Sequence, residues 1–235
     1  SVRVAIVSTL YNIWKEDTSL ISFYNKAFQD SSVNVKLTAL DVIDILSGED
    51  ALLKARELEK EIDPRTIRYL SRMYAKLKDE SKYKWFNWAM KQVEYGDKSY
   101  VISKYSKYLL EKDNDVVWRA CKKLEEEAIY ENNKNVRYTS AIAIHKLRER
   151  NLRKIEGIGK DITDQREASR GKPYDLKLLE KKRQELINHD NRMRELIKKI
   201  YDLEVNENVK KKYEERGLLI ADSPLVEKGH EANEP

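Results

Sequence analysis

The sequence predicts an all-α protein: an irregular helical array or α-solenoid-like bundle followed by a long C-terminal helix. Apolar residues recur at helical spacing through most of the chain, as at Val33, Leu37, Leu40 and Ile43. Seven Gly and four Pro in 235 residues are too few for the many turns of a β-rich fold. Candidate helix pairs begin near residues 32, 64, 97 and 133, a period of about 33 to 36 residues that is typical of α-solenoids.

Several helix boundaries carry their own signals. Ser32 is the expected N-cap of the helix that starts at residue 33, and Gly48 is expected to end that helix in a left-handed conformation. Asp63 and Pro64 open the next helix, because Asp caps the free N–H groups and Pro has the right φ for the first helical position. The pairs Gly96-Asp97 and Asn132-Asn133 open two more. Further helices are predicted over 3–14, 18–28, 49–61, 82–94 and 114–130. Residues 2–6 alternate as a strand does, but a strand without a partner is unstable, so we interpret them as helix.

Three segments share a polar–Val–basic helix opening, namely residues 34–40, 115–121 and 135–141. This pattern resembles HEAT-type helical repeats over about residues 30–150, and the resemblance implies stacked helix pairs. The spacing from Val116 to Val136 is too short for one full repeat. An irregular helical bundle therefore stays open as the alternative.

Changes in composition and apolar periodicity along the chain predict four segments. Residues 1–150 form a helical repeat-like domain, 151–172 a Gly-containing connector, 173–217 a long basic helix region, and 218–235 a flexible acidic tail. The helix over 174–203 carries a heptad seam in which two of eight positions are charged. Because such a seam makes a poor autonomous coiled coil, we expect the helix to pack on the protein's own body or on a copy of itself. The seam positions are Leu176, Leu179, Arg183, Leu186, Asp190, Met193, Ile197 and Ile200.

The net charge of +5 is unevenly distributed. Residues 1–132 carry 22 Lys and Arg against 22 Asp and Glu, whereas residues 133–216 carry 23 against 15. A basic half beside a neutral half indicates a polyanionic partner such as nucleic acid. The alternative is that these charges only coat solvated helix faces.

The sharpest local motif is Gly157-Ile158-Gly159-Lys160 within residues 152–162. It resembles the hairpin of the helix-hairpin-helix family, and the resemblance implies non-specific binding of the DNA backbone, with these four residues against phosphate. Glycines permit close approach, and free amides at a helix N-terminus bind anions. The polar residues 163–166 depart from the family pattern, so an ordinary interhelix turn is the alternative. The candidate nucleic-acid-binding residues are Arg148, Arg150, Arg153, Lys154, Gly157, Gly159 and Lys160.

Aromatic residues alternate with lysines over 83–88 and again over 100–108. Exposed aromatic rings beside Lys can stack on the bases of a single strand. However, Trp85 and Trp88 lie at helical spacing with Val93, so we expect these rings, and those of Tyr100, Tyr105 and Tyr108, to pack in the core.

The sequence lacks the constellations of an enzyme. None of the three His has a second His or Cys at helical metal-binding spacing, and Cys121 has the setting of a small buried hydrophobe. We therefore expect no catalytic residues, no metal and no cofactor. A single Cys and the absence of a signal-peptide pattern favour an intracellular location. No run of about 18 apolar residues is present, so no membrane partner is expected.

Two functions follow as hypotheses. The first is a non-enzymatic helical protein that binds the backbone of DNA or RNA through its basic C-terminal half. The second is a protein–protein scaffold or a structural subunit of a larger assembly, including a viral particle, with no nucleic-acid contact. A homo-oligomer formed through the helix over 174–203 belongs to this second hypothesis.

Overall fold

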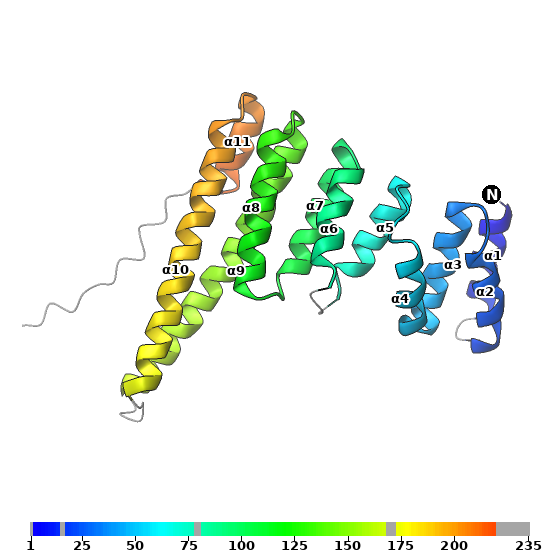
Figure 1. The fold of residues 1–235 in the computed structure, drawn as a ribbon, viewed down its shortest axis with the longest axis horizontal. Coiled ribbons are helices and arrows are strands. Elements are labelled where there is room, and N and C mark those ends of the chain that lie inside the picture. Colours follow the sequence, from blue (N-terminus) through cyan, green and yellow to red (C-terminus); the bar gives the residue numbers. More distant parts are fainter. Residues whose placement is uncertain (1, 15–16, 78–80, 168–172, 220–235) are drawn as a thin grey trace, which may run out of the picture. The chain divides into compact units, whose positions relative to one another are not determined.

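The structure, a computed structural model, describes residues 2–14, 17–77, 81–167 and 173–219. Within these ranges the chain forms eleven α-helices, one short 3-10 helix and no strand (Figure 1), which confirms the all-α prediction. The chain divides after Tyr105 into two compact units. Unit 1 comprises residues 1–105, and unit 2 starts at residue 106.

Unit 1 is a series of short helices in which α3 contacts α1, α2, α4 and α5, and α5 contacts α6. The segment over residues 2–6 is helical, as we interpreted it, because it opens α1. The helix α7 begins in unit 1 and ends in unit 2. The elements are α1 (Val2–Ile13), η1 (Thr18–Leu20), α2 (Ile21–Phe28), α3 (Val33–Leu46), α4 (Gly48–Glu57), α5 (Pro64–Tyr74), α6 (Tyr83–Gln92) and α7 (Tyr95–Leu109).

Of two helix boundaries predicted from the sequence, the start at Asp63 is confirmed and the end at Gly48 is not. The carboxylate of Asp63 accepts hydrogen bonds from the backbone N–H groups of Arg65 and Thr66 at 2.9 and 3.4 Å, with Pro64 as the first helical residue, as predicted. A hydrogen bond from the Arg65 side chain lowers the pKa of Asp63 below its ordinary value. The prediction for Gly48 was wrong. Extended backbone at Ser47 ends α3, and Gly48 is the first residue of α4.

The core of unit 1 is rich in aromatic rings that the sequence predicted to be buried. Phe86 is fully buried and stacks on Tyr105, with ring centroids 5.0 Å apart and an interplanar angle of 21°. Trp85 meets Tyr74 edge to face at 5.0 Å. Trp88 is half-buried. These contacts make the aromatic residues of α6 part of the packing rather than an exposed platform.

Unit 2 is built on three long helices (Figure 1). Helix α9 contacts both α8 and α10, and α10 contacts α8 directly. Ion pairs from Arg137 to Glu204 and from Arg148 to Asp190 show that α9 and α10 run antiparallel. The short helix α11 contacts α9 and is followed by Gly217, whose φ of 63° is the left-handed conformation that favours glycine. The bounds are α8 (Asn114–Tyr130), α9 (Lys134–Glu167), α10 (Pro173–Asp202) and α11 (Glu207–Glu215).

Residues 151–167 are not the connector that the glycines suggested. They continue α9, so the predicted boundary at residue 150 lies inside a helix. Ile155 and Ile162, two turns apart on one face, are 2% and 7% exposed. This buried stripe outweighs the helix-weakening effect of Gly157 and Gly159, which is about 1 kcal/mol for each relative to Ala. Gly171 lies outside the described residues.

The heptad seam of α10 faces α8 and α9 of the same chain. Leu186, Met193, Ile197 and Ile200 are at most 2% exposed. The helix therefore packs on the protein's own body, the first of the two arrangements that the seam allowed. Because those four side chains are already covered, they do not offer the apolar surface that a second copy would need.

No helix in the described part of the chain has both the length and the apolar character to cross a bilayer. Of the predicted acidic tail over 218–235, only Leu218 and Leu219 are described. They form a turn in which Leu218 is buried. The remainder of the predicted tail lies outside the described residues.

Candidate nucleic-acid interface

Two of the predicted phosphate-binding residues are buried. Arg148 is 3% exposed, and its Nε lies 2.9 Å from Oδ1 of Asp190. Arg150 is 7% exposed and donates hydrogen bonds to the carbonyl of Leu110, at 2.7 Å, and to the carbonyl of Lys112. Burial lowers the pKa of Arg150. Both guanidinium groups hold unit 2 together, so the prediction that they contact nucleic acid was wrong.

The Gly157–Lys160 motif forms neither a hairpin nor a turn, because it lies in the interior of α9. Backbone N–H groups there bond to carbonyls four residues earlier and are not free to bind a phosphate. Neither glycine lies where a larger side chain would clash with its surroundings. A Cβ at Gly157 would meet nothing within 4 Å, and one at Gly159 would lie 3.7 Å from Nε of Arg183. Arg153 and Lys160, which share a helix face with Gly157, are exposed.

Lys154 joins a group of cations that come from different helices. Its side chain is exposed, and its Nζ lies 3.4 Å from Oδ1 of Asn114 at the start of α8. Partial burial lowers the pKa of Lys154, as do the positive charges of Arg150 and of Lys182 on α10, while Asp113 opposes them.

Next to these lysines lies a feature that the sequence analysis did not single out. The half-buried ring of Trp118 on α8 has the Nζ of Lys122 at 5.4 Å and the guanidinium of Arg192 at 5.6 Å from its centroid. The imidazole of His189 stacks on the same indole, 6.0 Å away and 10° from parallel. We call Trp118, Lys122, His189 and Arg192 the Trp118 cluster.

The Trp118 cluster lies beside a small hollow where three helices meet. Asn114, Arg150, Asn151 and His189 line one small hollow beside Trp118, so side chains of α8, α9 and α10 converge there. The buried amide of Asn151 donates a hydrogen bond to the carbonyl of Leu186 at 2.7 Å. The Trp118–Lys122 spacing of one helical turn was visible in the sequence. The partners on α10 were not, because they come from a distant part of the chain.

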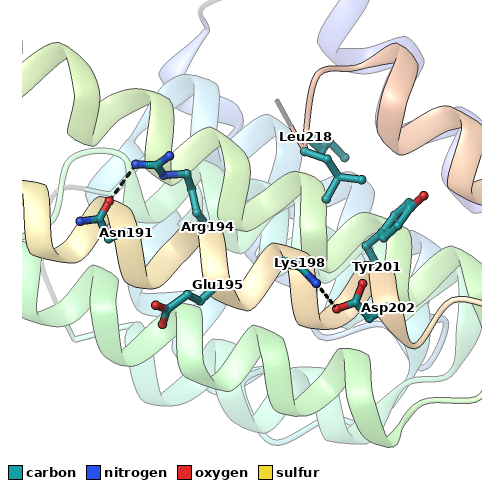
Figure 2. Close-up of a pocket in the computed structure, with 8 residues that line it drawn as sticks. Asn191, Arg194, Glu195, Lys198, Tyr201, Asp202 and Leu218 are labelled. Carbon is teal, nitrogen blue, oxygen red and sulfur yellow. Dashed lines mark hydrogen bonds and ion pairs between the residues drawn. The ribbon is translucent and has the colours of Figure 1, made fainter. Parts of the chain in front are cut away.

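A groove of about 700 Å³ lies along a different face of α10 (Figure 2). Its polar side chains bond to their neighbours: Arg194 donates to Asn191 at 2.8 Å, and Lys198 pairs with Asp202 at 2.6 Å. Tyr201 donates to Glu214, and this bond raises the pKa of Tyr201. None of the described residues that line the groove is a Ser, Thr, Cys or His. Its lining is Asn191, Arg194, Glu195, Lys198, Tyr201, Asp202, Leu218 and Leu219.

Other reactive groups are dispersed or buried. Cys121 is fully buried, as predicted, and burial raises the pKa of its thiol to about 12. Within the described residues, no three His, Cys, Asp or Glu side chains gather where a metal ion could bind. The Nε2 atom of His145 lies 3.7 Å from Oε1 of Glu149, one turn away on the same helix.

Comparison of the chain with protein-family models, with curated proteins and with solved structures found no match.

Proposed function

We propose that the chain is a non-enzymatic binding protein that engages the phosphate backbone of nucleic acid through unit 2. The observation that carries the proposal is a set of cations from three helices: Lys122 and Arg192 lie over the ring of Trp118, and Lys154 bonds to Asn114, one turn before Trp118 on α8. Lys122 comes from α8, Lys154 from α9, and Lys182 and Arg192 from α10.

The chemistry of these cations supports backbone binding. Lys122 and Arg192 contact an aromatic ring, and neither forms an ion pair with a carboxylate in the described part of the chain. The positive charges of Arg150 and Lys182 disfavour the charged form of Lys154, while Asp113 and Glu111 favour it, and a phosphate beside Lys154 would add to the favourable side. Several other basic residues of unit 2 are paired with acids, as Lys199 is with Glu125 at 2.6 Å.

The test is the salt dependence of binding. We expect the wild-type chain to bind a labelled DNA or RNA oligonucleotide at about 50 mM salt, and its affinity to fall steeply as salt releases counterions. The double variant Lys154→Gln with Lys182→Gln should bind more weakly, with a slope of log K against log[salt] that is smaller by about two. Fluorescence anisotropy over a salt series measures this slope.

The matched control removes two charges elsewhere in unit 2. Lys198 and Lys211 are exposed, and each pairs with an acid one turn away on its own helix. The double variant Lys198→Gln with Lys211→Gln should keep the wild-type slope. Equal loss in both double variants, or no binding by the wild type at about 50 mM salt, would refute the proposal.

The second candidate function, a protein–protein scaffold, is favoured by a separate observation in unit 1. Helix α1 carries a single charged residue, and Val2, Ile13 and the following Trp14 are 76%, 60% and 49% exposed. Exposed apolar stripes of this kind mark protein interaction surfaces. If scaffolding is the function, light scattering should detect an oligomer that Ile13→Glu dissociates. The control Leu53→Glu, at a residue of α4 that is 58% exposed, should leave the oligomer intact. A monomer at every concentration would exclude self-assembly through α1.

A further inference from the structure

We infer that the Trp118 cluster is a stacking site for an unpaired base, so that the preferred ligand is single-stranded nucleic acid rather than duplex. The inference rests on the proposed function and narrows it. A cationic patch alone binds any polyanion, whereas an accessible indole beside cations also binds the face of a base.

Three of the aromatic residues of unit 1 that the sequence analysis considered for stacking are buried and cannot take this role. Trp85 is 7% exposed, and Phe86 and Tyr105 are fully buried. Trp118 is half-buried, as Trp88 and Tyr100 of unit 1 are, and its indole has both a stacked imidazole and two cations beside it. The Trp118 cluster therefore joins an accessible indole to cations, the combination that holds single strands.

The stacked imidazole of His189 shows that a planar ring fits against the indole. The two rings are within 10° of parallel, an offset-stacked arrangement that aromatic pairs favour. His189 is half-buried on a helix surface, and rotation of its side chain would leave that position to a base. Arg192 and Lys122 would then exchange a contact with the ring for a contact with the phosphates on either side of the base. No buried charge loses its partner in this exchange.

Duplex nucleic acid cannot use the ring in the same way. Its bases are paired and stacked on one another, so a side chain reaches a base face only after that base leaves the stack. A polyanion without bases can use only the cations. The three ligand classes therefore separate the role of the ring from the role of the charges.

The experiment measures the affinity of the full chain for a labelled oligo-dT, for a mixed-sequence duplex of equal length and for inorganic polyphosphate, the last by competition. We expect Trp118→Leu to lower affinity for oligo-dT by about 5- to 150-fold and to leave the other two affinities within about twofold. Trp118→Phe, which keeps a flat ring, should restore most of the oligo-dT affinity. Trp88→Leu, at a half-buried Trp of unit 1, is the matched control and should match the wild type.

Each result is decisive. Selective loss for oligo-dT with rescue by Phe supports the inference, and the Phe variant also guards against loss of fold in Trp118→Leu. Equal loss for all three ligands, or no loss for oligo-dT, overturns the stacking role while backbone binding by unit 2 stands. If the wild type binds none of the three ligands, both the inference and the proposed function fail.

Discussion

Replacing Asp190 with Ala is expected to lower the free energy of unfolding by about 3 to 5 kcal/mol. Asp190 is 1% exposed, and its Oδ1 accepts a hydrogen bond at 2.9 Å from Arg148, which is 3% exposed. The Ala variant leaves the buried guanidinium without its carboxylate, and a buried charge without compensation is far more costly than the pair itself is favourable. Urea denaturation followed by circular dichroism measures the change.

Two further variants isolate the cause. Asp202→Ala removes an exposed carboxylate of the same helix that pairs with Lys198, so we expect a loss of at most about 1 kcal/mol. The double variant Arg148→Met with Asp190→Leu replaces the pair by apolar side chains and should recover most of the wild-type stability. If Asp190→Ala costs no more than Asp202→Ala, the pair does not have the buried character that the structure assigns to it.

The second large effect is expected in unit 1, where Phe86→Ala should lower the free energy of unfolding by about 3 to 5 kcal/mol. Phe86 is fully buried between Tyr105, on which it stacks, and Trp85, which meets it edge to face at 5.3 Å. Truncation removes both aromatic contacts and leaves a cavity. Hydrogen exchange of the backbone amides in α5 and α6 detects the loss.

Ile62→Ala provides the comparison for Phe86→Ala. Ile62 is also apolar and lies in unit 1, but it is 67% exposed. Its removal should change stability by about 0.5 kcal/mol or less, because no packed volume is lost. If the backbone amides of α5 and α6 exchange hydrogen at similar rates in the two variants, Phe86 does not stabilise the core of unit 1.

Helix positions could be predicted from the sequence because apolar periodicity reports which face is buried. The segment 114–130 was predicted with the bounds that α8 has. The prediction of helix ends failed at glycines, because glycine is found both at helix C-termini and inside helices. Glycine ends helices when its φ is positive, as at Gly217, but Gly48, Gly157 and Gly159 all lie within helices. For Gly157 and Gly159 the burial of Ile155 and Ile162 favours the helix, and that burial depends on tertiary contacts that the local sequence does not show.

The candidate site could be predicted only in part. The basic bias of residues 133–216 directed attention to unit 2, which holds the cations of the proposed site. Which of them are exposed depended on partners from other helices, because Asp190 and the carbonyl of Leu110 bury Arg148 and Arg150. The contact between Trp118 and α10 joins residues about 70 positions apart, and helical periodicity carries no signal at that range.

The pairing of Arg148 with Asp190 also determines the register in which the long helices α9 and α10 pack. Amphipathic helices rich in Leu and Ile can slide past each other by one turn and still cover their aliphatic faces. Such a slip along α9 would separate the Asp190 carboxylate from the Arg148 guanidinium, and the amide of Asn151 would lose the carbonyl of Leu186. The charged position in the seam thus fixes the register of α9 and α10. In this register His189 and Arg192 of α10 contact Trp118.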